Sequence, residues 1–174
     1  MPELMRDNPL SKIPTLVLDD GRALYDSPVI CEYLDALDGK PQLFPLDRKR
    51  RILALRRQAL GDGFLDLLVL ARNERLREQP SEVHLRSAAV RSTAVLDSLE
   101  READALAASA FDIGHIAIGS RYTISISVLP RRIGVKAIRV LLFGTPSSRR
   151  GPRSKRRCRW TILERAGNFL ASPR

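Results

Sequence analysis

The sequence predicts an α+β fold with a small strand–turn–strand–helix unit first, an all-helical domain after it and a basic tail at the end. Residues 10–37 combine two short apolar runs, turn residues between them and a helical apolar pattern. Beyond these residues the apolar side chains recur at helical spacing, until the charge pattern changes abruptly after residue 119. We therefore expect domains at residues 1–40 and 46–119, followed by a tail at 120–174.

Residues 16–25 have the pattern of a β-hairpin. Pro14 precedes the apolar run 16–18, and the second short run covers 23–25. Asp20 and Gly21 lie between them, and both residue types tolerate the left-handed backbone of a tight turn. Residues 1–9 are a polar lead-in for which no element is predicted.

A helix is predicted to follow the hairpin, with Ser27 as its N-cap and Pro28 at its first position. The helix start favours a negative group, because its first N–H groups lack partners within the helix and its dipole is positive there. Asp26 adds an acceptor for a cationic amine, so the pair suits an amino-acid head group. Alternatively, Ser27 only caps the helix and Asp26 only interacts favourably with its dipole. One helical face is apolar and carries Val29, Ile30, Tyr33, Leu34 and Leu37.

The order of these pieces resembles the glutathione-binding half of the glutathione S-transferase family, a thioredoxin-like unit. The motif runs from Asn8-Pro9-Leu10 through Lys12-Ile13-Pro14-Thr15-Leu16 to Asp26-Ser27. The resemblance implies that Pro14 is cis and that the Ile13 backbone pairs with the cysteinyl part of glutathione. It further implies that Asp26 and Ser27 hold the γ-glutamyl head group, and that Lys12 reaches the glycine carboxylate. Glutathione is then the substrate, no metal is implied, and the electrophilic partner is unspecified.

The resemblance also exposes a gap at the front of the chain. In the family, a strand, a helix and another strand precede the cis-proline and bring the residue that activates the glutathione thiol. This chain begins later than that residue, so we expect a truncated first domain, no assignable catalytic residue and weak or absent transferase activity. Cys31, inside the predicted helix, is expected to be a core residue.

The second domain is predicted to be helical. Leu43-Phe44-Pro45 resembles the family's interdomain linker, and Pro80 separates two long helices, the second opened by Ser81. Gly61 and Gly63 are expected to let another helix approach the first one closely. In the first helix, apolar residues recur at three to five residues at Ile52, Leu55, Ala59, Phe64, Leu67, Leu68 and Ala71. In the second, a narrow seam predicted to pack against another helix consists of Leu85, Ala89, Ser92, Leu96, Leu99, Ala103 and Leu106. Glu100, Glu102 and Asp104 are interpreted as a solvated face.

A third helix is predicted near residue 112, where Asp112 is a cap and His115 occupies the position that is acidic in the family. We interpret His115 as structural. In the family, the first domain and the first two helices of the second domain form the homodimer interface. The resemblance therefore allows a homodimer here.

The composition gives no sign of a membrane-spanning, secreted, disulfide-bonded or metal-binding protein. No apolar run approaches the roughly 18 residues of a membrane span, and no secretory leader is visible, so we expect a cytoplasmic protein. Cys31 and Cys158 have neither disulfide nor metal-site spacing.

The net charge of +10 comes from the tail. Residues 1–119 hold 16 Lys and Arg against 19 Asp and Glu, whereas residues 120–174 hold 14 basic residues and one acid. Within the tail, residues 122–128 alternate like a strand and 144–159 have a disordered composition. Three explanations stay open: a basic arm for nucleic acid or another polyanion, an unfolded extension without a role, and a frame-shift product. We favour the frame shift, and nucleic acid is the less favoured partner.

Overall fold

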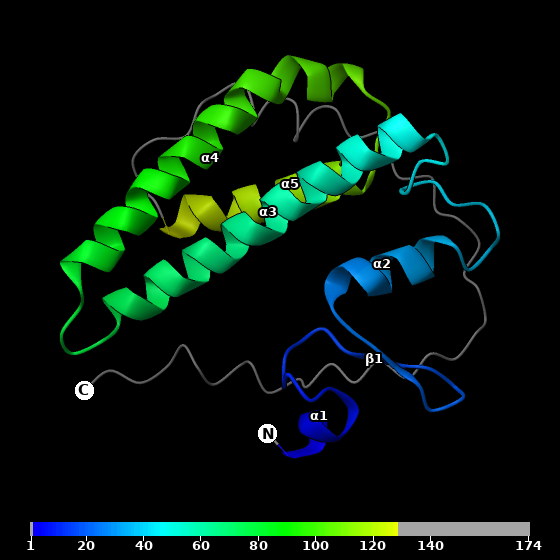
Figure 1. The fold of residues 1–174 in the computed structure, drawn as a ribbon, viewed down its shortest axis with the longest axis horizontal. Helices are drawn as coiled ribbons and strands as arrows, with labels where there is room; N and C mark the ends of the chain where they lie inside the picture. The colour runs from blue at the N-terminus through cyan, green and yellow to red at the C-terminus, as the bar shows by residue number, and fades with distance from the viewer. Residues whose placement is uncertain (1, 129–174) are drawn as a thin grey trace. The chain divides into compact units, whose positions relative to one another are not determined.

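A computed structural model describes residues 2–128, which divide into two compact units on either side of the Lys40–Pro41 bond. The first unit contains α1 (Pro2–Asp7), β1 (Leu16–Val17), β2 (Ala23–Leu24) and α2 (Ser27–Asp35), and the second contains α3 (Arg48–Arg75), α4 (Glu82–Ala108) and α5 (Ile113–Val128) (Figure 1). A two-stranded sheet with helices, followed by helices alone, confirms the predicted α+β class.

The hairpin forms as predicted, with slightly shorter strands. β1 and β2 are antiparallel, and Leu16 lies opposite Leu24. In the turn, Gly21 has a φ of +86° and donates its N–H to the Leu18 carbonyl at 2.9 Å. That backbone is left-handed, and glycine adopts it at little cost because it has no Cβ.

Helix α1 occupies residues for which the sequence predicted no element, so that prediction is wrong. Six residues are too few to show a helical period, which is why the pattern is silent there. The helix nevertheless contributes Leu4 to the buried side chains of the first unit, together with Leu16 and Ile30.

The cap of α2 lies one residue earlier than predicted. Asp26 has an extended backbone and its carboxylate accepts the Ser27 N–H, so Asp26 is the N-cap and Ser27 the first helical residue. Asp and Ser cap helices about equally well, and the choice between neighbours is made by the backbone. On the predicted apolar face Ile30 is buried, whereas Val29 is 48% exposed.

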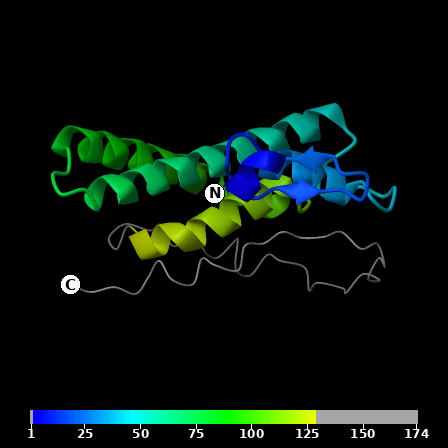
Figure 2. The ribbon, with the colours of Figure 1, turned by 90° about the horizontal axis from the view of Figure 1, so that it is seen from below.

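In the second unit, α3 packs along α5 and against α4 (Figure 2). The caps of the two long helices have the chemistry expected of them: Asp47 accepts the Arg50 N–H at 2.9 Å and Ser81 accepts the His84 N–H at 3.4 Å. Large buried side chains between the helices include Phe64, Leu68, Leu99, Leu106, Ile113 and Ile118.

The buried face of each long helix was predicted only in part. In α3 Phe64, Leu68 and Ala71 are buried and Leu67 is half-buried. Ile52 is 61% exposed and Ala59 is exposed, whereas the polar Arg57 and Gln58, which a hydrophobic pattern overlooks, are buried. In α4, Ser92, Leu99, Ala103 and Leu106 are buried as predicted, and Ala88 is buried in place of Ala89.

Gly61 is a point of close contact between α3 and α5. A Cβ added there would lie 2.9 Å from the carbonyl carbon and oxygen of Ala117, a distance that real Cβ atoms do not show. At Gly63 an added Cβ would meet nothing within 4 Å. The prediction that these glycines admit another helix is therefore confirmed for Gly61 and wrong for Gly63.

The backbone of residues 122–128 is helical and completes α5, so the predicted strand there is wrong. Alternation over seven residues is a weak signal when a helix already leads into the segment, because extending a helix costs far less than starting a strand. The predictions for residues 129–174 fall outside the described residues. Among the described helices, none is long and apolar enough to cross a membrane.

Candidate functional site

The hairpin brings the two halves of the predicted glutathione site to the same end of the first unit. Residues 12–14 lead into β1, and residues 26–27 follow β2. Since the strands are antiparallel and Leu16 lies opposite Leu24, both segments lie at the open end of the hairpin, away from its turn.

The first half of the site is an exposed loop. Lys12 and Pro14 are exposed, Ile13 is 72% exposed, and the Ile13–Pro14 peptide is cis, as the resemblance implies. An exposed isoleucine contributes little to folding. What this residue can offer a ligand is its backbone, together with an apolar side chain beside it.

The conformation of this loop is fixed by hydrogen bonds from the buried side chain of Asn8, which is 1% exposed. Its amide nitrogen donates to the Lys12 carbonyl at 2.9 Å and to Thr15 Oγ1 at 3.0 Å. Its amide oxygen accepts the Leu10 N–H at 2.9 Å. The sequence motif included Asn8 only as a lead-in, and no pattern in the sequence indicated that it is buried.

The second half of the site is the start of α2. Asp26 is exposed and Ser27 is half-buried. The first backbone donors are engaged within the helix: the Ser27 N–H with the Asp26 carboxylate, and the Val29 and Ile30 N–H groups with the Asp26 carbonyl at 3.1 and 3.2 Å. Pro28 has no N–H. Among the described residues no partner of the Ser27 hydroxyl is found, so this hydroxyl, rather than a row of free N–H groups, is the donor that the helix start leaves available.

A buried polar cluster in the second unit was not predicted. Arg57 is 2% exposed and donates to Ser109 Oγ at 3.1 Å; its Nε lies 3.7 Å from a carboxylate oxygen of Glu102 and has no hydrogen-bond partner among the described residues. Glu102 also pairs with Arg56. Glu102, interpreted from the sequence as part of a solvated face, is 27% exposed and makes these ion pairs as well.

The start of α5 joins this cluster through His115. Its Nε2 lies 3.1 Å from the Leu106 carbonyl, which only accepts, so Nε2 carries a proton. Its Nδ1 is 3.1 Å from the Asp112 backbone nitrogen, while the His115 N–H donates to Asp112 Oδ1 at 3.2 Å. An imidazole thus replaces the usual carboxylate in a reciprocal capping box. His115 Nδ1 also lies 2.8 Å from Asp112 Oδ1, so the contacts of His115 hold the start of α5 and join it to the end of α4, which agrees with a structural role.

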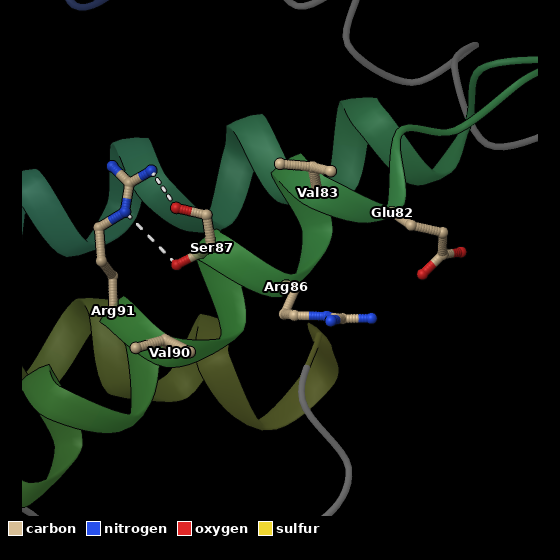
Figure 3. A pocket seen from close by; sticks show the side chains of 6 residues that line it. All are labelled: Glu82, Val83, Arg86, Ser87, Val90 and Arg91. Atoms are coloured by element: carbon tan, nitrogen blue, oxygen red, sulfur yellow. Dashed lines mark hydrogen bonds between the residues drawn. The ribbon is translucent and has the colours of Figure 1, made fainter.

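A shallow pocket lies elsewhere, on one face of α4 (Figure 3). Its lining consists of Glu82, Val83, Arg86, Ser87, Val90 and Arg91. Arg91 is tied to the Ser87 hydroxyl at 2.8 Å, and no predicted site residue is in the lining. Within residues 2–128, no group of His, Cys, Asp and Glu could hold a metal ion.

Among the comparisons with known proteins, the family model concerns the first unit alone. The family model described as glutathione S-transferase, N-terminal domain, matches residues 1–37. A curated relative, the uncharacterized GST-like protein YibF of Escherichia coli K12, is 34% identical over 95 residues, which are 53% of this chain and 47% of that protein. The chain therefore aligns with about half the length of this relative.

Solved structures extend the likeness to both units. A glutathione transferase family member from Pseudomonas fluorescens Pf-5 with bound glutathione is 38% identical, with a TM-score of 0.67 over 75% of this chain and 65% of that one. A glutathione S-transferase from Methylobacillus flagellatus KT with glutathione bound is 29% identical, with a TM-score of 0.70 over 83% of this chain and 74% of that one. Over the part that these comparisons cover, the chain is similar to members of the glutathione S-transferase family.

Proposed function

We propose that the first unit binds glutathione at the open end of the hairpin. The observation that carries the proposal is the antiparallel register, which gathers residues 12–14 and 26–27 at one end of a segment matched by the family's N-terminal model. Similar structures from Pseudomonas fluorescens Pf-5 and Methylobacillus flagellatus KT contain glutathione, which supports this ligand.

Each proposed contact follows from the chemistry of the exposed groups. The γ-glutamyl head has an ammonium beside a carboxylate: Asp26 pairs with the ammonium and the Ser27 hydroxyl donates to the carboxylate. The Ile13 backbone binds the cysteinyl peptide. The Lys12 ammonium reaches the glycine carboxylate as a point charge.

The family reaction forms a bond between the glutathione sulfur and an electrophilic carbon, and the thiol must first lose its proton. None of the five proposed binding residues is assigned to take that proton or to stabilise the thiolate, because their proposed roles lie at the two ends and the backbone of the tripeptide. We propose that this chain holds glutathione and turns over electrophiles weakly or not at all.

Calorimetric titration of the full 174-residue chain with reduced glutathione tests the proposal, with Ser27→Ala as the decisive variant. The Ser27 hydroxyl is not part of the cap, so its removal should leave α2 intact and weaken binding by roughly tenfold or more, the usual effect of a hydrogen bond to a charged group. The matched control is Thr93→Ala, which removes an exposed α4 hydroxyl bonded only to the Ala89 carbonyl. Equal affinity of Ser27→Ala and the unmodified chain would refute the assignment.

A further inference from the structure

Asn8 has the features of a buried residue that fixes the conformation of a binding loop without contacting the ligand. It is among the largest fully buried side chains of the protein, at 1% exposure, so it cannot touch a ligand. Its side chain makes three hydrogen bonds, all to the loop that follows it: to Leu10, Lys12 and Thr15. A buried amide with both hydrogens and its oxygen engaged is fully satisfied, and such networks hold one geometry.

The Lys12 carbonyl is the group that this network controls most tightly. It accepts from Asn8 Nδ2 at 2.9 Å and from Thr15 Oγ1 at 3.0 Å. The Lys12–Ile13 peptide is trans, since among the described residues the cis bonds are at Ile13–Pro14 and Tyr25–Asp26. In a planar trans peptide the C=O and the next N–H point in opposite directions. Holding the Lys12 carbonyl toward buried Asn8 therefore turns the Ile13 N–H outward.

We propose that Asn8 is a positioning residue: it orients the Lys12–Ile13 peptide so that the Ile13 N–H faces a ligand's backbone carbonyl. This inference rests on the proposed glutathione function and goes beyond it, because it assigns part of the affinity to a residue that never contacts the ligand. The ligand group concerned is a peptide carbonyl, as distinct from the charged head group served by Asp26 and Ser27.

Asn8→Asp is the sharpest variant, because it keeps the shape and the acceptor of the Leu10 N–H but loses both amide hydrogens. A carboxylate oxygen then lies against the Lys12 carbonyl, and two acceptors repel. We expect glutathione to bind the full-length variant about tenfold more weakly. In titrations of ¹⁵N-labelled protein, the shift of the Ile13 amide on adding glutathione should disappear, while the shift at Ser27 persists.

Two comparisons separate positioning from simple loss of stability. Leu4→Ala removes a buried side chain of the same unit without touching the loop, and is expected to lower the midpoint of thermal unfolding but retain the glutathione shift at Ile13. Thr15→Val removes the second donor to the Lys12 carbonyl and should weaken binding about threefold, whereas Thr15→Ser keeps the hydroxyl and should restore it.

The outcomes distinguish the two levels of the proposal. If the unmodified chain shows no glutathione shift, the proposed function fails and the positioning role fails with it. If the unmodified chain binds and Asn8→Asp binds equally well, with an unchanged Ile13 shift, the positioning role alone is overturned. An equal loss of the Ile13 shift in Leu4→Ala at matched stability would also overturn it, because the effect would then be one of folding.

Discussion

At the scale of single residues, the candidate site depends on a few side chains that fix backbone direction. Asp26 illustrates this: its carboxylate caps α2 through the Ser27 N–H, and its carbonyl accepts two further N–H groups of the first turn. The same residue is exposed, so its carboxylate is accessible to the ammonium of the proposed ligand. Asp26 thus has a structural role beside its proposed binding role, whereas the Ser27 hydroxyl has only the proposed binding role.

Ser11 gives a prediction at this scale. Its φ of 49° lies in the left-handed region, which costs a residue with a Cβ roughly 1 kcal/mol. Ser11→Gly should be neutral or stabilise the chain by up to about 1 kcal/mol, while the β-branched Ser11→Val should destabilise it by about 1–2 kcal/mol.

Urea unfolding of the two Ser11 variants measures the difference, and Ser87→Gly and Ser87→Val in α4 provide a matched pair at a helical position. At Ser87 the glycine variant should be the one that loses stability. An equal loss for both Ser11 variants would contradict the backbone assignment.

At the scale of elements, the contact between α3 and α5 is set by Gly61. In Gly61→Ala the new methyl would meet the Ala117 backbone, which cannot rotate away, so the helices must separate. We expect a net loss of about 1–3 kcal/mol despite the better helix propensity of alanine. Gly63→Ala has open space and should gain about 0.5–1 kcal/mol. Chemical denaturation of both variants tests this, and equal stability of the two would rule out the close approach.

The contacts of Glu74 at the turn between α3 and α4 predict that the stability of the protein depends on pH. Glu74 accepts the Ser81 N–H at 2.7 Å and pairs with Arg77, and these contacts lower the pKa of its carboxyl, the Ser81 bond most. A group whose pKa is lower in the folded state stabilises the protein above its unfolded pKa, and this contribution is lost as the pH falls through the folded value.

The difference in unfolding midpoint between the unmodified chain and Glu74→Gln should therefore be present at pH 6–7 and shrink below about pH 4. Glu78→Gln, at an exposed acid just beyond the end of α3, is the control and should show a smaller difference throughout. A midpoint difference for Glu74→Gln that does not change with pH would contradict this account.

At the scale of the whole molecule, the elements with local signals were predictable. The hairpin follows from Asp20 and Gly21 between two apolar runs, and α4 follows from Ser81 after Pro80. What escaped prediction depends on contacts distant in sequence. From the sequence alone Arg57 would be assigned to the surface, but in the fold it is buried against Ser109 and α5. Helix α1 is too short to show a helical pattern.

The residues of the candidate site stay a prediction, and the structure bears on how they lie relative to one another. The motif located residues 12–14 and 26–27, and the register of the strands explains why they belong together. The helix start differs from expectation, since its N–H groups are engaged and the cap is Asp26. The role of the tail, the homodimer and the electrophile stay predictions of the sequence.

The central claim is that one end of the hairpin binds the glutathione tripeptide, and mapping amide shifts in the ¹⁵N-labelled full-length chain tests it most directly. Reduced glutathione should shift the amides of Lys12, Ile13, Thr15, Asp26 and Ser27 together, with one dissociation constant, and leave residues 82–91 of α4 unchanged. The α-linked peptide Glu-Cys-Gly, which lacks the adjacent ammonium and carboxylate of the γ-glutamyl head, should bind more weakly. Shifts confined to α4, or equal binding of both peptides, would contradict the account.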